Sequence, residues 1–464
     1  MRKFIPLAVA LVLAGCSFTP EYQRPAAPVP SAWPGSATGT GALAAASAVR
    51  PDGNWRSIFT DPQLQELIAA ALEHNRDLRI AVARVEEARA LAGIARADRF
   101  PTVDLAAQRA ASLTPGDLSA TGRQLNAQRY DVNLGITAFE LDFWGRVKSL
   151  DDAARAGFLA SDYARRAFRL SLIADVAGAW LSWLELDERA GLAAATATSR
   201  GETRRLIDKR REAGLAGDLD FLAADGAWQS ARAEAASLAR QRAAAANALR
   251  LLVGKDVELR SAPLDTLNPT AELPVGLPSE VLLARPDVLA AEQKLIAANA
   301  NIGAARAAFL PKILLTAVAG TASRALSGLF DAGSGAWSFV PLLKLPLFDA
   351  GRSEGNYDLA VARRNVAVAE YEKSLQQAFR EVADLLAARQ YYAEQMTALG
   401  AAAKSQGERM QRVEARYLAG VSSQLELLDA QREHQAAQQS ALAARRSWLA
   451  SAASLYKALA AGES

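Results

Sequence analysis

The sequence predicts an internally duplicated α+β protein with four β-strands and unusually long helices. Its 464 residues are 51% hydrophobic and 22% charged, which is the balance of a globular protein. Motifs of the first half recur 206 to 210 residues later, which indicates two copies of one unit. Two long tracts lack proline and are rich in alanine, the best helix former. The segments before these tracts alternate apolar and polar residues, as half-buried strands do.

The composition excludes several functional classes. Lys and Arg number 53 against 50 Asp and Glu, so the net charge of +3 argues against a nucleic-acid-binding surface. One cysteine and two histidines are too few for a Cys/His zinc site or an intrachain disulfide. No nucleophile–base arrangement, phosphate loop or metal cluster indicates an enzyme, and no cofactor is expected. His74 is expected near the end of a short helix, and His434 on a solvated, charged helix face.

The N-terminus has the pattern of a processing signal. A basic start and the apolar stretch 4–14 predict a signal peptide over residues 1–15, too short for the roughly 20 residues of a membrane-spanning helix. The cysteine that follows, Cys16, resembles the lipobox cysteine of bacterial lipoproteins. That resemblance implies a diacylglyceryl group and an acyl chain on Cys16 and sorting to the outer membrane. The Pro-rich segment 16–56 is expected to be an extended tether.

The chain is a tandem repeat. Asn75-Arg76-Asp77-Leu78 recurs as Arg285-Pro286-Asp287-Val288 at an offset of 210 residues. Further along, Ala213-Gly214-Leu215 recurs as Ala419-Gly420-Val421 at an offset of 206. The difference between the offsets is best placed in a surface loop of the strand region. The sequence therefore predicts a first repeat over 57–260, a linker over 261–277 and a second repeat over 278–464.

Each repeat is predicted to run helix, strand, strand, long helix, return helix. The proline-free tracts 146–213 and 352–419 would each form a helix about 100 Å long. From Tyr130 to Ala138, apolar side chains alternate with small or polar ones, which predicts a strand with one apolar face. The four predicted strands cover 101–111, 128–141, 311–323 and 336–348, and the return helices cover 218–253 and 424–460.

Four such strands cannot form a complete structure in one chain. Strands with one apolar and one polar face resemble those of outer-membrane barrels, the smallest of which have about 8 strands. Closure must come from several chains, and three chains would supply 12 strands, an even number in the usual range. The long helices carry charges such as Arg363 and Lys373, so they must project into an aqueous compartment. A hollow barrel continued by a tube of helices is a conduit.

Motifs along essentially the whole chain match one known family. They include Asp61-Pro62-Gln63-Leu64, Ala284-Arg285-Pro286-Asp287 and Leu428-Asp429-Ala430-Gln431-Arg432. On these motifs the sequence resembles the outer-membrane efflux channels of the TolC family, in particular its OprM-like lipoprotein branch. The resemblance implies a homotrimer with a 12-stranded barrel in the outer membrane, a helical tunnel across the periplasm and no catalysis. It implies two partners, a periplasmic membrane-fusion adaptor and an inner-membrane RND pump that expels drugs or other small toxic compounds.

The resemblance also assigns roles to the turns between the long and return helices. It places Gly214, Leu215, Gly420 and Val421 at the periplasmic tip, where the adaptor docks. Residues just beyond the turns, Asp220, Glu426 and Asp429, would form acidic rings at an aperture that favours cations. The alternative is that acidic residues in a first helical turn only complement the helix dipole.

A latch at the aperture is expected from the same resemblance. Tyr417 falls on a family position that hydrogen-bonds an acidic residue matching Asp220. Ser422 stands where some members have an arginine, so Arg416 is an alternative partner.

Two other functions remain open at this point. One is an exit duct for polypeptides in type I secretion, which deletion phenotypes would separate from small-molecule efflux. The other is a lipid-anchored coiled-coil scaffold without a pore, which conductance in planar bilayers would exclude.

Overall fold

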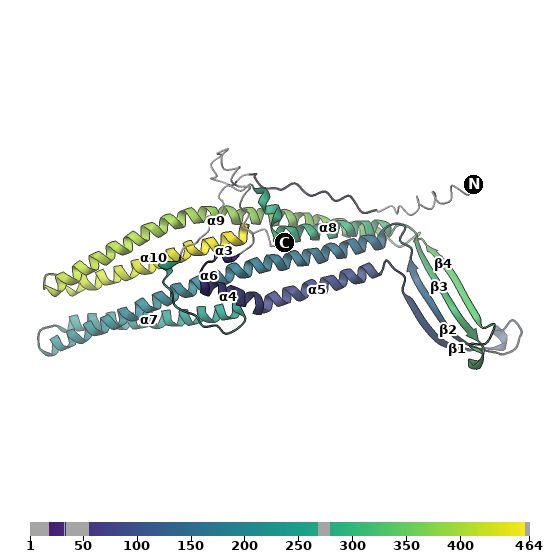
Figure 1. The fold of residues 1–464 in the computed structure, drawn as a ribbon, viewed down its shortest axis with the longest axis horizontal. Coiled ribbons are helices and arrows are strands. Elements are labelled where there is room, and N and C mark those ends of the chain that lie inside the picture. The colour runs from purple at the N-terminus through teal and green to yellow at the C-terminus, as the bar shows by residue number, and fades with distance from the viewer. Residues whose placement is uncertain (1–17, 32, 34–54, 268–278, 460–464) are drawn as a thin grey trace. The chain divides into compact units, whose positions relative to one another are not determined.

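A computed structural model describes residues 18–31, 33, 55–267 and 279–459 (Figure 1). The signal peptide 1–15, Cys16, most of the tether and part of the linker lie outside the described residues. The chain divides into two compact units, each described on its own below. The first unit takes in the N-terminal segment up to Ala26, Arg84–Asp162 and Ala290–Glu372, and the second takes in Ala27–Ala83, Tyr163–Leu289 and the chain from Lys373 onward.

The α+β class and the internal duplication are confirmed element by element. Helices α5 and α8 each have 22 residues, α6 and α9 each have 67, and α7 and α10 each have 36. Helix α6 continues through Gly178, Gly191 and Gly201 without a break. The bounds are α4 Pro62–His74, α5 Arg76–Ala97, α6 Arg146–Glu212, α7 Asp218–Val253, α8 Pro286–Ala307, α9 Arg352–Leu418 and α10 Gln424–Leu459.

The four strands form one antiparallel sheet in the order β1-β2-β3-β4, within the first unit (Figure 1). The strands are β1 Val103–Thr114, β2 Leu125–Glu140, β3 Lys312–Ser323 and β4 Gly335–Lys344. Strand β4 ends at Lys344, short of the expected residue 348, because its partner there is Lys312, the first residue of β3. Cross-strand partners share a face of the sheet, and one such row joins Leu105, Leu134, Ala319 and Trp337. One face is therefore apolar, whereas the other carries side chains such as Asp131 and Asn133.

A β-bulge in β2 keeps this face apolar. The register shifts between Ile136 and Phe139, and Ala138 has a φ of 52°, which is rare for a residue other than glycine. The expected alternation through Ala138 is therefore wrong after Ile136. Because of the inserted residue, Phe139 pairs with Leu315 and joins the same face as Ile136.

Both long helices begin after a glycine in the left-handed region. Gly145 has a φ of 70° and Gly351 has a φ of 82°. Arg146 then pairs with Glu140 at 2.7 Å, and this hydrogen bond raises the pKa of the Arg146 guanidinium. Asp349 accepts hydrogen bonds from the start of α9, which hold the pKa of its carboxyl below the usual value.

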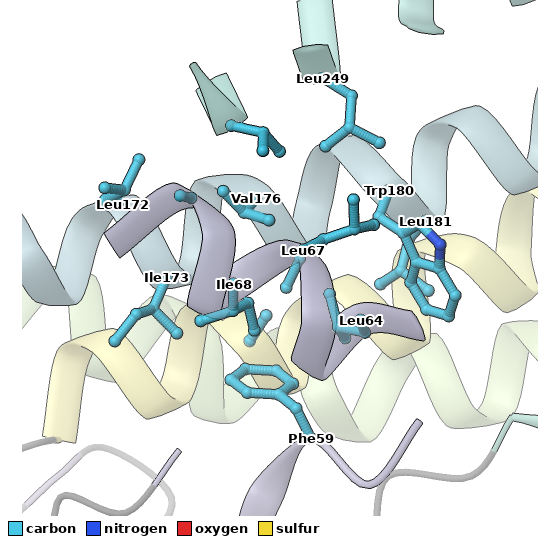
Figure 2. Close-up of a cluster of buried hydrophobic side chains, with 14 of the residues drawn as sticks. Phe59, Leu64, Leu67, Ile68, Leu172, Ile173, Val176, Trp180, Leu181 and Leu249 are labelled. Carbon is cyan, nitrogen blue, oxygen red and sulfur yellow. The ribbon is translucent and has the colours of Figure 1, made fainter. Parts of the chain in front are cut away.

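The core of the second unit is built around α4 (Figure 2). Asp61 caps this helix by accepting a hydrogen bond from the Leu64 N–H at 2.8 Å, and Pro62 fits the first turn. Helix α6 contains a window with a mean hydropathy of 1.2, apolar enough for a membrane span, but 56% of it is buried. The apolar composition of α6 is explained by packing in this core. The side chains labelled in Figure 2 are Phe59, Leu64, Leu67, Ile68, Leu172, Ile173, Val176, Trp180, Leu181 and Leu249.

In both repeats, within the second unit, a side chain near the start of a helix donates a hydrogen bond to the end of the return helix. Asn75, which is 3% exposed, donates to the Leu252 carbonyl at the end of α7 and caps α5 through Leu78. At the matching place, Arg285 donates to the Ala458 carbonyl at the end of α10. Arg285 also pairs with Asp287 and Glu381, each at 2.8 Å, and these carboxylates raise the pKa of its guanidinium against the effect of burial.

The N-terminal segment from Phe18 to Arg24, here called the strap, is held on the first unit. Arg24 binds the buried carboxylate of Glu292 through two hydrogen bonds of 2.7 and 2.9 Å, and the Tyr22 hydroxyl donates to Glu292 at 2.9 Å. Burial and the carboxylate of Glu292 raise the pKa of the Tyr22 hydroxyl. Asn299 donates to the Pro20 carbonyl, and the strap ends against Trp144 through Phe18. A Cβ at Gly303 would lie 2.3 Å from Thr19 Oγ1, so a glycine is needed there.

Replacing Gly254 tests the packing at the end of α7. Gly254 has a φ of 80°, and a Cβ there would lie 2.5 Å from the His74 carbonyl oxygen. We expect Gly254→Ala to lower the free energy of unfolding by about 2 kcal/mol or more, from left-handed strain plus the backbone clash. Gly226→Ala, in open space within α7, should be neutral or stabilise by up to about 1 kcal/mol. Thermal unfolding of the detergent-solubilised protein measures both, and equal melting temperatures would contradict the packing described.

Removing the carboxylate under the strap should release it. Glu292→Ala deletes the acceptor of three hydrogen bonds, while Arg24, half-exposed, regains water. Solvent screening weakens the ion pair of a half-exposed arginine. We therefore expect amide hydrogen exchange in residues 18–24 to become about tenfold faster, which corresponds to about 1.4 kcal/mol. Glu370→Ala, at an exposed position of α9, is the control, and Glu292→Gln should give an intermediate rate. Unchanged exchange in Glu292→Ala would show that this carboxylate does not hold the strap.

Candidate aperture and tip

The two turns between long and return helices have the same backbone geometry. After α6, Gly214 has a φ of 74°, its N–H donates to the Arg211 carbonyl, and the Leu215 N–H donates to the Arg210 carbonyl. After α9, Gly420 has a φ of 72° and Val421 donates to the Arg416 carbonyl. Both are Schellman motifs, in which glycine accepts the left-handed conformation that ends a helix. All of these residues belong to the second unit.

The turns present apolar side chains to solvent. Leu215 is 79% exposed and Val421 is 67% exposed, at matching places in the two repeats. Leu219 and Leu425, one helical turn further on, are 83% and 77% exposed. Exposed apolar patches of this kind mark interaction surfaces more often than isolated leucines do.

The acids just beyond the turns lie in the first turns of α7 and α10, and Asp220 caps its own helix. The Gly217 N–H donates to Asp220 at 3.3 Å, and Asp218 lies 3.9 Å from Arg211. The Glu426 N–H donates to the Ser423 hydroxyl at 3.2 Å, so Glu426 lies in the first turn of α10. Asp220 is exposed and Glu426 is half-buried. The helix-dipole interpretation therefore has a structural basis, and it leaves the Asp220 carboxylate open to a second partner.

Asp429 differs from the other acids. Its carboxylate pairs with Arg409 of α9 at 3.2 Å and with Arg432 of α10 at 2.6 Å. Two arginines beside one carboxylate leave no net negative charge at this position. Within one chain Asp429 joins the two helices of its hairpin, and its place in an acidic ring between copies stays a prediction.

The expected latch partners lie close to the second turn. The Tyr417 ring packs on a small cluster that includes Val413 and Leu427. No hydrogen bond joins Tyr417 to Asp220 within the part of the chain that the structure describes. Arg416 is exposed, and it has no ion pair among the described residues. A latch through these groups must join neighbouring copies of the chain.

Polar side chains connect the two hairpins away from the tip. Glu234 of α7 accepts hydrogen bonds from Gln435 and Gln439 of α10 at 3.1 and 2.7 Å. Arg446 of α10 pairs with the buried Glu185 of α6 at 3.0 Å. Burial lowers the pKa of the Arg200 guanidinium, and the carboxylate of Glu234 partly offsets this lowering. The hairpins are thus joined by directional bonds, which fix their register.

A long-helix glycine that makes room for a ring of the return helix occurs in both repeats and was not predicted from the sequence. A Cβ at Gly201 of α6 would lie 2.9 Å from Trp228 Nε1, and a Cβ at Gly407 of α9 would lie 3.0 Å from His434 Cε1. Both the glycines and the rings are 206 residues apart, so the repeat offset could have revealed them. His434 packs against α9 with Nδ1 buried, so the expectation of a solvated histidine was wrong.

The described residues contain no group of three or more His, Cys, Asp or Glu placed to hold a metal ion. The duplicated turns, with their exposed apolar side chains and the acids that follow them, are the candidate functional feature of the second unit.

Comparisons with known proteins agree with this arrangement. The sequence matches the profile of the family described as outer membrane efflux protein over residues 67–255 and 277–461. It is 44% identical over 467 residues to the probable efflux pump outer membrane protein SepC of Pseudomonas putida, covering 99% of this chain and 96% of SepC. It is 46% identical over 429 residues to outer membrane protein OprJ of Pseudomonas aeruginosa, covering 92% and 88%.

The fold is similar to that of a solved channel. The open state of the MtrE outer membrane channel of Neisseria gonorrhoeae superposes with a TM-score of 0.85 at 38% identity, covering 97% of this chain and 98% of MtrE. Because the family profile spans both repeats and the relatives align along nearly the whole length, the chain belongs to the outer membrane efflux protein family.

Proposed function

We propose that this protein is the outer-membrane channel of a tripartite efflux system, a passive exit duct for drugs or other small toxic compounds. The observation that carries the proposal is the four-stranded sheet with one apolar face and two open edges, joined directly to paired long helices. The named functions of SepC, an efflux pump protein, and MtrE, an outer membrane channel, support it.

The proposal requires a trimer. Strands β1 and β4 are the edges of the sheet, and lipid cannot satisfy their unpaired backbone groups. Three copies would pair β1 of each chain with β4 of the next. On helix α5, Leu91 and Ile94 are 57% and 62% exposed, which supports a further contact between copies.

The partners follow from the two ends of the duct. The exposed tip around Gly214, Leu215, Gly420 and Val421 would dock a periplasmic membrane-fusion adaptor through apolar contacts, and the adaptor would link the channel to an inner-membrane RND pump. At the N-terminus, a lipid on Cys16 would add a membrane anchor next to the strap.

Purified protein in planar bilayers tests the function directly. We expect discrete conductance steps from a detergent-extracted species that sediments as a trimer, because only a closed barrel satisfies every strand edge. Deletion of the gene should also increase susceptibility to small toxic compounds. A stable monomeric pore would refute the closure argument, and a trimer without conductance would refute the channel.

The aperture can be tested separately. We propose that Asp220 of one chain pairs with Tyr417 of the next, with Arg416 as a second partner, and that Glu426 lies in the same constriction. A hydrogen bond to a charged group contributes about 1.5–3 kcal/mol, so Asp220→Ala with Tyr417→Phe should raise the single-channel conductance. Asp429→Asn is the matched control, because its carboxylate is already paired within one chain. Parental conductance in the double variant, at unchanged trimer content, would remove the latch.

A further inference from the structure

The apolar face of the sheet carries one charged side chain within the four strands, all of which are described. Register places Arg109 of β1 opposite Tyr130 of β2, and Tyr130 opposite Ser323 of β3. The other strand charges, Asp104, Arg129, Asp131, Glu140, Lys312 and Lys344, fall on the polar face by the same pairing. An arginine is costly in the middle of a lipid-facing band and tolerated near its edges.

Arg109 lies where the apolar band ends. The apolar rows run from the pair Ile313–Leu343 up to the pair Ala107–Val132, about 26 Å along the strands. This length is comparable with the roughly 25 Å band of outer-membrane barrels. Beyond the Arg109–Tyr130 pair, the β2 side of this face turns polar with Gln128 and Asn126, which lie opposite Ala111 and Leu113 of β1. Tyrosine at such a boundary is typical of the membrane–water interface.

The surroundings of Arg109 leave its charge uncompensated. Its guanidinium lies 5.6 Å from the centre of the Tyr130 ring and donates to Gln128 Oε1 at 3.4 Å. Arg109 is exposed, and the described residues give it no carboxylate. By contrast, Arg129 on the opposite face pairs with Asp131 at 2.7 Å.

A neighbouring copy does not supply the missing acid from its strand. If β4 of the next chain pairs with β1, its apolar face offers Gly335, Trp337, Phe339, Pro341 and Leu343, none of them acidic. With no acid on the facing strands, a lipid phosphate is the partner that this position favours.

The topology identifies which lipid layer meets Arg109. The far ends of the strands connect to helices α5, α6, α8 and α9, which the proposed function places in the periplasm. Arg109 lies toward the two loops at the other end, 115–124 and 324–334, and therefore faces the outer leaflet. A guanidinium forms paired hydrogen bonds with a phosphate, whose geometry matches its fork.

We propose that Arg109, with Tyr130 and Gln128, forms a binding site for a phosphate group of an anionic lipid in the outer leaflet of the outer membrane. The Tyr130 ring orients the guanidinium by a cation–π contact, and Gln128 occupies one of its donors. The remaining N–H groups hold the phosphate while the acyl chains cover the apolar rows below. The site rests on the proposed function for its orientation in the membrane.

Titration with a phosphorylated glycolipid tests the site. The purified trimer is titrated with bis-phosphorylated lipid A and with dephosphorylated lipid A, and native mass spectrometry counts the bound molecules. We expect Arg109→Gln to weaken binding of the phosphorylated form about tenfold and Arg109→Lys to weaken it less. Arg123→Gln, in the loop after β1, is the matched control and should bind like the parent. The dephosphorylated form should bind weakly to all of them.

Three outcomes would overturn the site. In the first, Arg109→Gln binds phosphorylated lipid A like the parent. In the second, binding of the dephosphorylated form depends on Arg109 equally. In the third, trimer content falls in Arg109→Gln, which would assign Arg109 to a contact with a loop acid of the next copy, such as Asp331. Conductance of the same samples separates the lipid site from the proposed channel function. Arg109→Gln, on the outer face, should conduct like the parent. A parent protein without conductance would refute the channel itself.

Discussion

The open edges of the sheet are the constraint on which the rest of the structure depends. A sheet of four strands leaves the backbone groups of β1 and β4 without partners, and hydrocarbon offers none. Closure of that sheet therefore requires other copies of the chain. The bulge at Ala138 keeps Phe139 on the lipid-facing side, and the left-handed glycines before α6 and α9 turn the chain from strand to helix.

The duplication explains how one chain builds two similar hairpins with different chemistry. Asn75 and Arg285 make the same bond to the end of a return helix, one through an amide and one through a guanidinium. Gly201 and Gly407 both make room for a ring, a tryptophan in one repeat and a histidine in the other. Backbone geometry is conserved between the halves of this chain, whereas the side chains that use it differ.

Much of the fold could be predicted from the sequence, because proline positions, periodicity and the repeat offsets are strong local signals. The strand faces, the long helices and the glycine turns are of this kind. The bulge could not be predicted, since Ala138 continues the alternation in sequence and only pairing with Leu315 shows the shift. The pairing of Asp429 with Arg409 is a contact between helices, and no local pattern encodes it. Contacts between chains at the proposed aperture depend on assembly, which no local pattern in the sequence encodes.

The strap sets a physical reference for depth in the membrane. The Phe18 ring of the strap packs on Trp144, whose Nε1–H donates to the Pro311 carbonyl just before β3. In the sequence Cys16 stands two residues before Phe18, so a lipid on Cys16 would be tethered at this end of the sheet. With Arg109 and Tyr130 near the opposite rim, the sheet would have one lipid contact for each leaflet. The distance between the two contacts would then set the membrane thickness that the sheet fits.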